Sequence, residues 1–320
     1  MLTLLFDDDQ EMSHVTLLTP AGYVYLSGEF DLIRYYMSTL DTASNIIFSD
    51  LVSDRDVEGV AAGFDGKIVS VIHSDHYLGN FVRPGYRYSV LGTGISHIIV
   101  STEQQKHDIQ QIRPELQISV VPPIVLNERL PMEDTKKIAG RITVVSRIDP
   151  VKRFEDMIKA TVLAKEKFPI LDLHLIGDIV DDAYARRLRE LIKENNATTY
   201  IFIDDPTVYV DAKYAISELT LMTSKHEGFA RTVVEAMNQG VVPISYPVKY
   251  GPTDVIKHDV NGIVTSSASV AELAAGIIDV MSDKDRMKRM ANREVETAQN
   301  FHRQQVENKW REIIASLEKA

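Results

Sequence analysis

The sequence has no cysteine among its 320 residues, so disulfide bonds and thiolate metal sites are excluded. This is typical of a protein from a reducing compartment. No apolar run approaches the roughly 20 residues that cross a membrane as a helix. The first residues, M-L-T-L-L-F-D-D-D, lack the basic start and longer apolar core of a signal peptide. We therefore expect a cytoplasmic protein, and peripheral attachment to a membrane stays open.

Acidic residues outnumber basic ones, with 46 Asp and Glu against 35 Lys and Arg. The formal net charge of −11 argues against general nucleic-acid binding, and a polyanionic substrate would require a local basic patch. Two acidic clusters, at 7–9 and 181–182, could suggest a metal site. Neither follows a suitable strand, so we interpret both as solvated loop charge and predict no metal and no cofactor.

The chain is long enough for two α/β domains. Alternating residues around Pro20, Ala21 and Gly22 predict a β-hairpin over 1–30. Short apolar runs separated by helical segments then predict an α/β domain over 31–125, with a parallel sheet. A helix is expected at 31–39, and the strands are expected at 45–48, 67–73, 96–100 and 118–121.

A second α/β series predicts a doubly wound, Rossmann-like domain over 126–300. Its first strand is R-I-T-V-V-S at 141–146, and a linker rich in proline and charge is expected at 122–137. The helix that ends the chain, 301–320, forms a separate segment. The pattern from 270 to 317 is amphipathic throughout, which predicts helix over that whole range.

The stretch K-H-E-G-F-A-R-T-V-V-E-A-M, 225–237, places Glu227 in a loop and Glu235 in the opening turns of a helix, separated by seven residues. The backbone N–H groups of Phe229, Ala230, Arg231 and Thr232 would lack helical partners and could hold a diphosphate. Either glutamate alone is more often a solvated charge or an offset to the helix dipole. Spacing and surroundings together favour a site.

A glycine stop follows this helix, then the run V-V-P-I-S-Y and the turn Y-G-P-T-D, which indicate a buried strand and a loop. With these neighbours the E-x7-E element resembles retaining glycosyltransferases of the GT-B fold. It is most similar to bacterial enzymes that glycosylate poly(glycerol phosphate) or poly(ribitol phosphate) teichoic acid, and to N-acetylglucosaminyltransferases of serine-rich adhesins. Against that pattern the first domain looks truncated, and its hairpin resembles a remnant of their β-rich insertion. The resemblance also implies that the C-terminal helix, 301–320, returns to the first domain.

Two basic residues follow the strand at 141–146: Arg147 ends it, and Lys152 lies five positions later in I-D-P-V-K-R. Both can face the carboxyl edge of the sheet, where open α/β sheets bind ligands. A solvated basic pair beside Asp149 or Glu155 is about as frequent on local sequence alone. The resemblance implies instead that both cations bind the diphosphate of the donor.

His73 ends the strand K-I-V-S-V-I-H, and His76 follows in S-D-H-Y. An isolated histidine is more often structural than catalytic. The resemblance implies that His73 reaches the transferred sugar or the acceptor, with His76 a second choice. Ser101-Thr102-Glu103 also matches the family, but we interpret it as a helix cap.

The resemblance implies a hexosyltransferase that moves glucose or N-acetylglucosamine from a UDP-sugar to a polyol-phosphate polymer or a protein hydroxyl. His73, Arg147, Lys152 and Glu227 would act in catalysis, and the cations, the 229–232 amides and Glu235 would bind the donor. The alternative is a non-catalytic subunit or truncated product that binds a nucleotide sugar or a partner chain. A sugar-nucleotide epimerase matches the motifs less well. Homo-oligomer formation through the exposed hairpin edge stays open.

Overall fold

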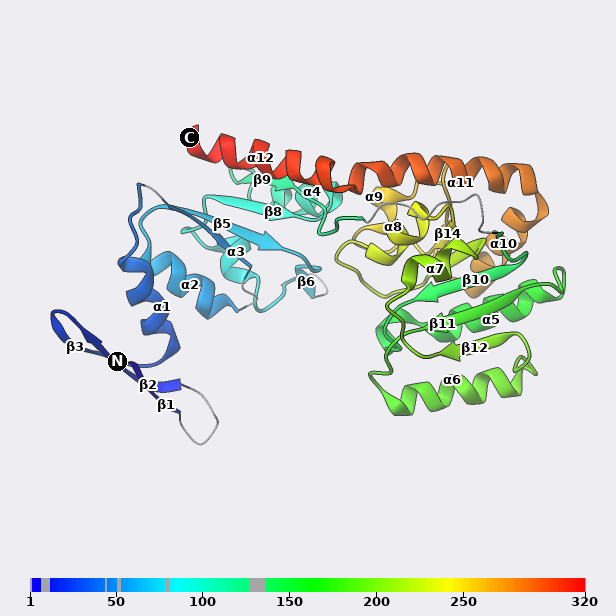
Figure 1. Ribbon diagram of the computed structural model, residues 1–320, viewed down its shortest axis with the longest axis horizontal. Helices are drawn as coiled ribbons and strands as arrows, with labels where there is room; N and C mark the ends of the chain where they lie inside the picture. Colours follow the sequence, from blue (N-terminus) through cyan, green and yellow to red (C-terminus); the bar gives the residue numbers. More distant parts are fainter. Residues whose placement is uncertain are drawn as a thin grey trace. The chain divides into compact units, whose positions relative to one another are not determined.

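The computed structural model describes residues 2–6, 12–43, 45–50, 53–78, 81–126 and 136–319. The chain forms two compact units, each described separately below: unit 1 is Met1–Val121 with Ile313–Ala320, and unit 2 is Pro122–Glu312 (Figure 1). The domain bounds expected from the sequence stay predictions beside these units. Most of the expected linker, and the acidic cluster at 7–9, lie outside the described residues.

Unit 1 contains a parallel sheet in the order β4-β5-β8-β9. Its strands are β4 (Ile46–Ser49), β5 (Lys67–Ile72), β8 (His97–Val100) and β9 (Gln117–Val120). They are joined through α2 (Asp54–Gly63), the short pair β6 (Tyr77–Leu78) and β7 (Phe81–Val82), α3 (Arg87–Leu91) and α4 (Glu103–Ile112). Parallel neighbours need such crossovers. All the strands predicted here are confirmed to within two residues at each end.

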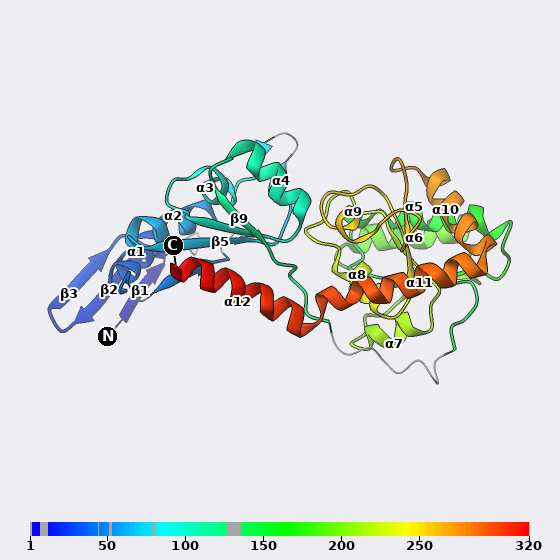
Figure 2. The same ribbon diagram turned by 90° about the horizontal axis from the view of Figure 1, so that it is seen from above.

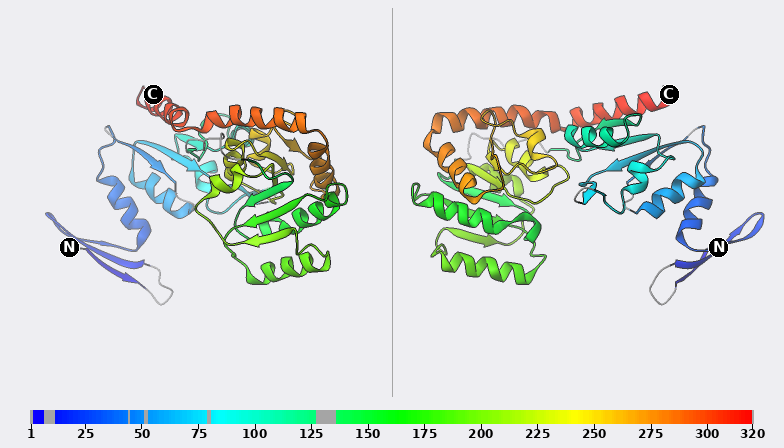
Figure 3. Two further views of the ribbon diagram at one scale, coloured as in Figure 1. Left: turned by 45° about the vertical axis from the view of Figure 1, so that its right-hand side comes forward. Right: turned by 180° about the vertical axis from the view of Figure 1, so that it is seen from behind.

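An antiparallel sheet, β1-β2-β3, precedes them, with β1 (Leu2–Phe6), β2 (Met12–Thr19) and β3 (Gly22–Leu26). The predicted hairpin is the β2–β3 pair, in which Thr19 faces Gly22. The prediction missed that β1 forms a further strand on the other side of β2. Both views of Figure 3 show this sheet extending beyond α1 (Glu29–Ser38).

Unit 2 is built on a parallel sheet in the order β12-β11-β10-β13-β14-β15. The strands are β10 (Arg141–Val145), β11 (Asp172–Ile176), β12 (Ile201–Asp204), β13 (Leu219–Met222), β14 (Val242–Ser245) and β15 (Ile263–Val264). The connecting helices are η2 (Pro150–Lys152), α5 (Phe154–Lys165), α6 (Asp182–Glu194), α7 (Val210–Ala215), α8 (Arg231–Asn238) and α9 (Pro252–Val255). The predicted doubly wound arrangement is confirmed for this unit.

The main core of unit 2 lies between the sheet and the helices α5, α6 and α10 (Val270–Ser282). Ile142, Val144, Leu173 and Leu175 point to that face and are at most 4% exposed. Their alternating neighbours on β10 and β11 point to the opposite face, because side chains along a strand alternate. That opposite face carries the polar residues described below.

The C-terminal region is helical over the predicted range 270–317, apart from extended residues at Asp283 and His302. It divides into α10 (Val270–Ser282), α11 (Lys284–Ala298), η3 (Gln299–Phe301) and α12 (Arg303–Lys319), in the succession shown in Figure 2. Asp283 is extended and caps α11 by accepting the Arg286 N–H at 2.8 Å. An N-cap side chain of this kind starts a new helix even inside an amphipathic pattern. Among the described residues, no helix combines the length and apolarity needed to span a membrane.

Two glycines let α1 and α2 approach closely. A Cβ on Gly63 would lie 2.3 Å from the Arg34 carbonyl oxygen, whereas one on Gly59 would meet the Phe30 ring at 3.3 Å. We expect Gly63→Ala to lower the free energy of unfolding by about 2 kcal/mol, because overpacking strains both helices. Gly59→Ala is the matched control, since a gain of about 1 kcal/mol in helix propensity offsets its milder contact. Urea unfolding followed by circular dichroism measures both, and equal stability of the two variants would contradict this packing.

Candidate functional site

The strand order of unit 2 creates a switch point between β10 and β13. From β10 the chain proceeds outward to β11 and β12, then returns to the other side of β10 as β13. The loops that follow β10 and β13 therefore leave the same carboxyl edge on neighbouring strands. In open α/β sheets this crevice is where ligands bind.

The loop after β10 is a tightly held turn. The Asp149 carboxylate accepts the Val151 N–H at 2.8 Å and so caps η2. Arg153 follows in a left-handed conformation, φ 53°. The loop after β13 is bonded onto this turn: Thr223 Oγ1 donates to the Lys152 carbonyl at 2.7 Å, and the Lys225 N–H donates to the Val151 carbonyl at 2.8 Å. These hydrogen bonds hold the loop after β10 and the loop after β13 against each other.

Lys152 and Glu227 meet across this junction. Lys152 Nζ donates to Glu227 Oε1 at 2.5 Å, and Ser224 Oγ donates to the same oxygen at 2.6 Å. The lysine and glutamate side chains are 17% and 14% exposed, and Ser224 is 4% exposed. The structure therefore brings together two residues that the sequence separates by 75 positions. No pattern in the sequence singles out Ser224, although it lies in the loop that leads to Glu227.

Glu227 is also held through its backbone. Its N–H donates to the Lys249 carbonyl, and its carbonyl accepts from the Tyr250 N–H, both at 2.9 Å. Gly251 follows at φ 106°, and a Cβ there would lie 2.1 Å from the Phe229 carbonyl oxygen. Only glycine combines that backbone angle with this close approach.

The N-terminus of α8 follows this loop. Ala230 precedes α8 in a left-handed conformation, φ 69°, and provides no side-chain cap. Within the described residues, the backbone N–H groups of Phe229, Ala230, Arg231 and Thr232 donate no hydrogen bonds. Such amides, with the positive end of the helix dipole, are suited to an anion. The side chains of Phe229 and Ala230 are buried at 5% and 3% exposure, so these residues also pack the core.

Glu235 lies in the second turn of α8, with Arg231 Nη2 3.7 Å from its carboxylate. Arg231 itself is 64% exposed in its side chain. Burial raises the pKa of Glu235, Arg231 opposes that effect, and the nearby charge of Asp211 adds to it. A half-buried carboxylate of this kind gains by accepting hydroxyl hydrogen bonds from a ligand.

Arg147 is exposed, and its loop pairs instead with the loop after β11, through the Ile148 N–H and the Asp178 carbonyl at 2.8 Å. In the described part of the chain its side chain makes no hydrogen bond or ion pair. Its shared role with Lys152 stays a prediction.

His73 belongs to unit 1, at the carboxyl end of β5, where its Nε2 lies 3.4 Å from Asp50 Oδ2. His76 is fully buried, 3.4 Å from the Gln105 amide. Thr102 accepts the Gln105 N–H at 3.1 Å, which confirms the predicted helix cap. The role predicted for His73 stays a prediction.

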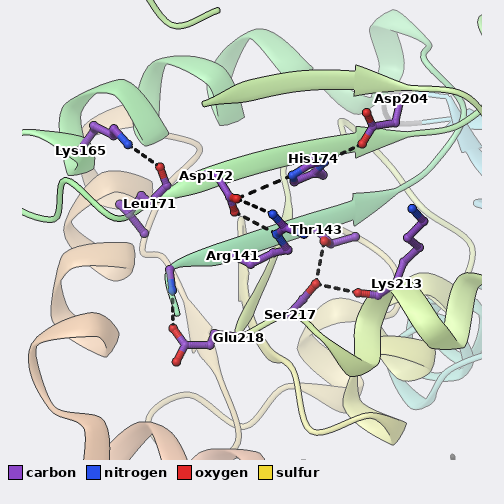
Figure 4. A network of polar contacts seen from close by, with 11 residues as sticks. Arg141, Thr143, Lys165, Leu171, Asp172, His174, Asp204, Lys213, Ser217 and Glu218 are labelled. Carbon is purple, nitrogen blue, oxygen red and sulfur yellow. Dashed lines mark hydrogen bonds and ion pairs between the residues drawn. The ribbon is translucent and has the colours of Figure 1, made fainter. Parts of the chain in front are cut away.

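A second polar cluster lies on the face of the unit 2 sheet opposite the main core (Figure 4). Arg141 binds both carboxylate oxygens of Asp172, at 3.2 and 2.6 Å. His174 Nδ1 lies 2.6 Å from Asp204 Oδ2, and its Nε2 lies 3.7 Å from Asp172. A hollow of about 400 Å³ adjoins this cluster, and the predicted site residues do not line it. No group of three or more potential ligands for a metal ion occurs within the described residues.

Comparison with known proteins identifies the family. The profile described as "Glycosyl transferases group 1" matches residues 130–296, just over half of the chain. The chain belongs to the group 1 glycosyltransferases. The match spans the turn that carries Lys152 and the whole E-x7-E element.

This glycosyltransferase is 21% identical to the poly(glycerol-phosphate) alpha-glucosyltransferase of Bacillus subtilis, over 95% of this chain and 46% of that protein. It is 26% identical to the GtfA subunit of a UDP-N-acetylglucosamine--peptide N-acetylglucosaminyltransferase of Streptococcus gordonii, over 98% of this chain and 64% of that one. The chain thus spans about half to two thirds of the length of these relatives.

Solved structures agree on the fold. The glycosyltransferase chain superposes on the crystal structure of TarM with a TM-score of 0.80. The match covers 100% of this chain and 68% of that one, at 18% identity. The pneumococcal GtfA structure with UDP and GlcNAc gives 0.79, over 98% and 66%, at 20% identity. The predicted GT-B fold class and family are thereby confirmed.

The His174 cluster predicts a pH-dependent stability of this glycosyltransferase. The Asp172 carboxylate, together with Asp204, raises the pKa of His174 against the effect of burial. Burial alone would raise the pKa of Asp172, but His174 and Arg141 outweigh it and lower that pKa to about 2. The histidine contribution is therefore full below about pH 6.5, the unfolded pKa, and is lost as the pH rises through the raised folded value.

We expect His174→Gln to destabilise the protein by about 1–2 kcal/mol at pH 5.5 and by less at pH 8.5, because only the imidazolium gains from both carboxylates. Urea unfolding at the two pH values measures the difference. Asp204→Asn is the companion variant and should also reduce the pH dependence. An equal loss for His174→Gln at both pH values would show that the charge of His174 contributes nothing.

Proposed function

We propose that this protein is a retaining hexosyltransferase that uses a UDP-sugar, with the donor bound by unit 2 at the carboxyl edge between β10 and β13. The observation that carries the proposal is the convergence of Lys152 and Glu227 beside the α8 amides that donate no bonds within the described chain. A cation, a set of free amides and a carboxylate together match a diphosphate joined to a polyhydroxyl sugar.

Different residues of the site bind different parts of the donor. Lys152 has three N–H donors and gives one to Glu227, so the others can bind a phosphate oxygen of the leaving UDP. The amides at 229–232 and Arg147 add to that stabilisation. Glu227 accepts from the sugar hydroxyls, and Glu235 accepts from the ribose. These groups are in place before charge develops on the leaving phosphate, so they act by electrostatic preorganisation.

The reaction needs no nucleophile from the protein. The bond between the anomeric carbon and the diphosphate oxygen breaks, and the acceptor hydroxyl forms a new bond from the same face. Its proton passes to a phosphate oxygen of the departing UDP. The anomeric configuration is therefore retained. His73, from unit 1, is assigned to the sugar or the acceptor.

The named activities of the relatives support the choice of substrates. They include a poly(glycerol-phosphate) glucosyltransferase, a poly(ribitol-phosphate) N-acetylglucosaminyltransferase and peptide N-acetylglucosaminyltransferases. We propose glucose or N-acetylglucosamine as the sugar, and a polyol-phosphate polymer or a protein hydroxyl as the acceptor. One structural relative is the GtfA/B complex, so a partner subunit belongs to the proposal. We place the reaction in the cytoplasm, without a metal ion.

Lys152→Ala tests the diphosphate role. We expect it to lower kcat for sugar transfer by at least about 10²- to 10³-fold, because the cation stabilises the charge on departing UDP. Release of UDP from a panel of UDP-sugars, with each acceptor class, measures the loss. Lys159→Ala is the matched control, since Lys159 is an exposed lysine on α5. Transfer by Lys152→Ala at the wild-type rate would remove this assignment. UDP binding by the wild-type protein without turnover of any donor would favour the non-catalytic alternative.

Glu235→Ala tests the ribose role. Calorimetry with UDP and dUDP isolates the 2′-hydroxyl, which dUDP lacks. We expect the wild-type protein to prefer UDP by about 1–3 kcal/mol, and Glu235→Ala to lose most of that preference, since a buried polar group left without a partner costs about that much. Arg231→Ala, which removes the charge facing Glu235 and keeps the carboxylate, should retain the preference. An unchanged preference in Glu235→Ala would assign the ribose contact to another residue.

A further inference from the structure

We propose that Ser224 is the positioning residue for Glu227: it holds the carboxylate so that one oxygen stays bonded to the protein and the other faces the hydroxyls of the donor sugar. This inference rests on the proposed function and deepens it. The site predicted from the sequence consists of ionisable side chains and backbone amides, and Ser224 adds a neutral hydroxyl that is buried and bonded to Glu227.

The side chain of Glu227 accepts two hydrogen bonds, and both are on the same carboxylate oxygen. Lys152 Nζ and Ser224 Oγ both donate to Oε1, at 2.5 and 2.6 Å. Oε2 accepts no hydrogen bond from the described residues, yet it is not among their buried unsatisfied atoms, so it reaches solvent. A carboxylate has about four acceptor positions on its two oxygens. Fixing Oε1 therefore leaves Oε2 as the acceptor available to a ligand.

Lysine alone cannot supply this orientation. Its ammonium is a point charge on a flexible stem, and in the proposed reaction it also binds the diphosphate. Ser224 lies two residues after the end of β13 and next to Thr223, whose hydroxyl donates to the loop that carries Lys152. At 4% exposure it has little freedom to move. The serine hydroxyl thus keeps Glu227 in place when Lys152 divides its donors between Glu227 and phosphate.

The test compares Ser224→Ala with Ser217→Ala. Both remove a hydroxyl from a buried serine of unit 2, but Ser217 bonds to Thr143 and to the Lys213 carbonyl, away from Glu227. We expect Ser224→Ala to lower kcat by about 10- to 100-fold, the range for a misplaced group in an active site. Its affinity for UDP, by calorimetry, should stay within about twofold of wild type, because UDP alone lacks the sugar. Ser217→Ala should change neither kcat nor UDP affinity.

Deoxy donors separate positioning from a merely structural role. UDP-sugars that lack the 3-, 4- or 6-hydroxyl identify the hydroxyl that donates a hydrogen bond to Glu227. It is the one whose removal lowers the wild-type rate most. On that donor Ser224→Ala should lose little further activity, while the other donors show the full loss. Equal losses on every donor, or a loss of UDP affinity matching the loss in kcat, would mean that Ser224 only supports the loop.

The outcomes also separate this inference from the proposed function. If the wild-type protein turns over UDP-sugars and Ser224→Ala does so equally well, the positioning role is overturned and the transferase remains. If the wild-type protein neither binds nor turns over any UDP-sugar of the panel, the proposed function fails first and the inference fails with it. We expect the two serine variants to unfold at the same midpoint temperature. Thermal unfolding that shows this excludes misfolding as the cause of a lost rate.

Discussion

The ion pair between Lys152 and Glu227 is the interaction on which the proposed site depends. It joins loops that follow two adjacent strands, and those strands are adjacent only because the chain reverses its direction of travel across the sheet at this point. Withdrawing two charges from water is costly, and a partly buried pair is weak evidence for stability. The pair is better explained by what it prepares: a lysine with spare donors and a carboxylate with a spare oxygen, on the edge of the sheet where ligands bind.

The segment 227–238 serves the core and the site at once. Phe229 and Ala230 direct their side chains into the protein, and Phe229 packs edge-on against Phe301 with ring centroids 5.6 Å apart. Because that packing fixes the backbone, the amides of the same residues, which donate no hydrogen bond within the described chain, are held in place without any side chain to orient them. Glu235 also combines the two roles. It lies half-buried beside α7, which raises its pKa, and it stays within reach of a ligand at the helix start.

The sheet of unit 2 differs on its two faces. One is covered by apolar residues under α5, α6 and α10, as expected for a parallel sheet buried between helices. The other carries Arg141, Asp172, His174 and Asp204 in one network across β10, β11 and β12 (Figure 4). Because Asp204 ends β12 at the carboxyl edge, this network anchors the start of the loop that follows β12.

The sequence by itself determined the order and type of most elements, the strands of both parallel sheets and the positions of Glu227, Glu235 and Lys152. Apolar runs, turn residues and a distinctive spacing are local properties, and they can be recognised without coordinates. It could not separate β1 from the hairpin or locate the helix break at Asp283, because the amphipathic period continues across that break while capping decides where a helix restarts. Only the tertiary structure decided that Ser224 shares an oxygen of Glu227 with Lys152, and that Arg147 makes no such contact with any residue in the described part of the chain. Those facts depend on side-chain directions in loops that are distant in sequence, and the strand order of the sheet alone brings those loops together.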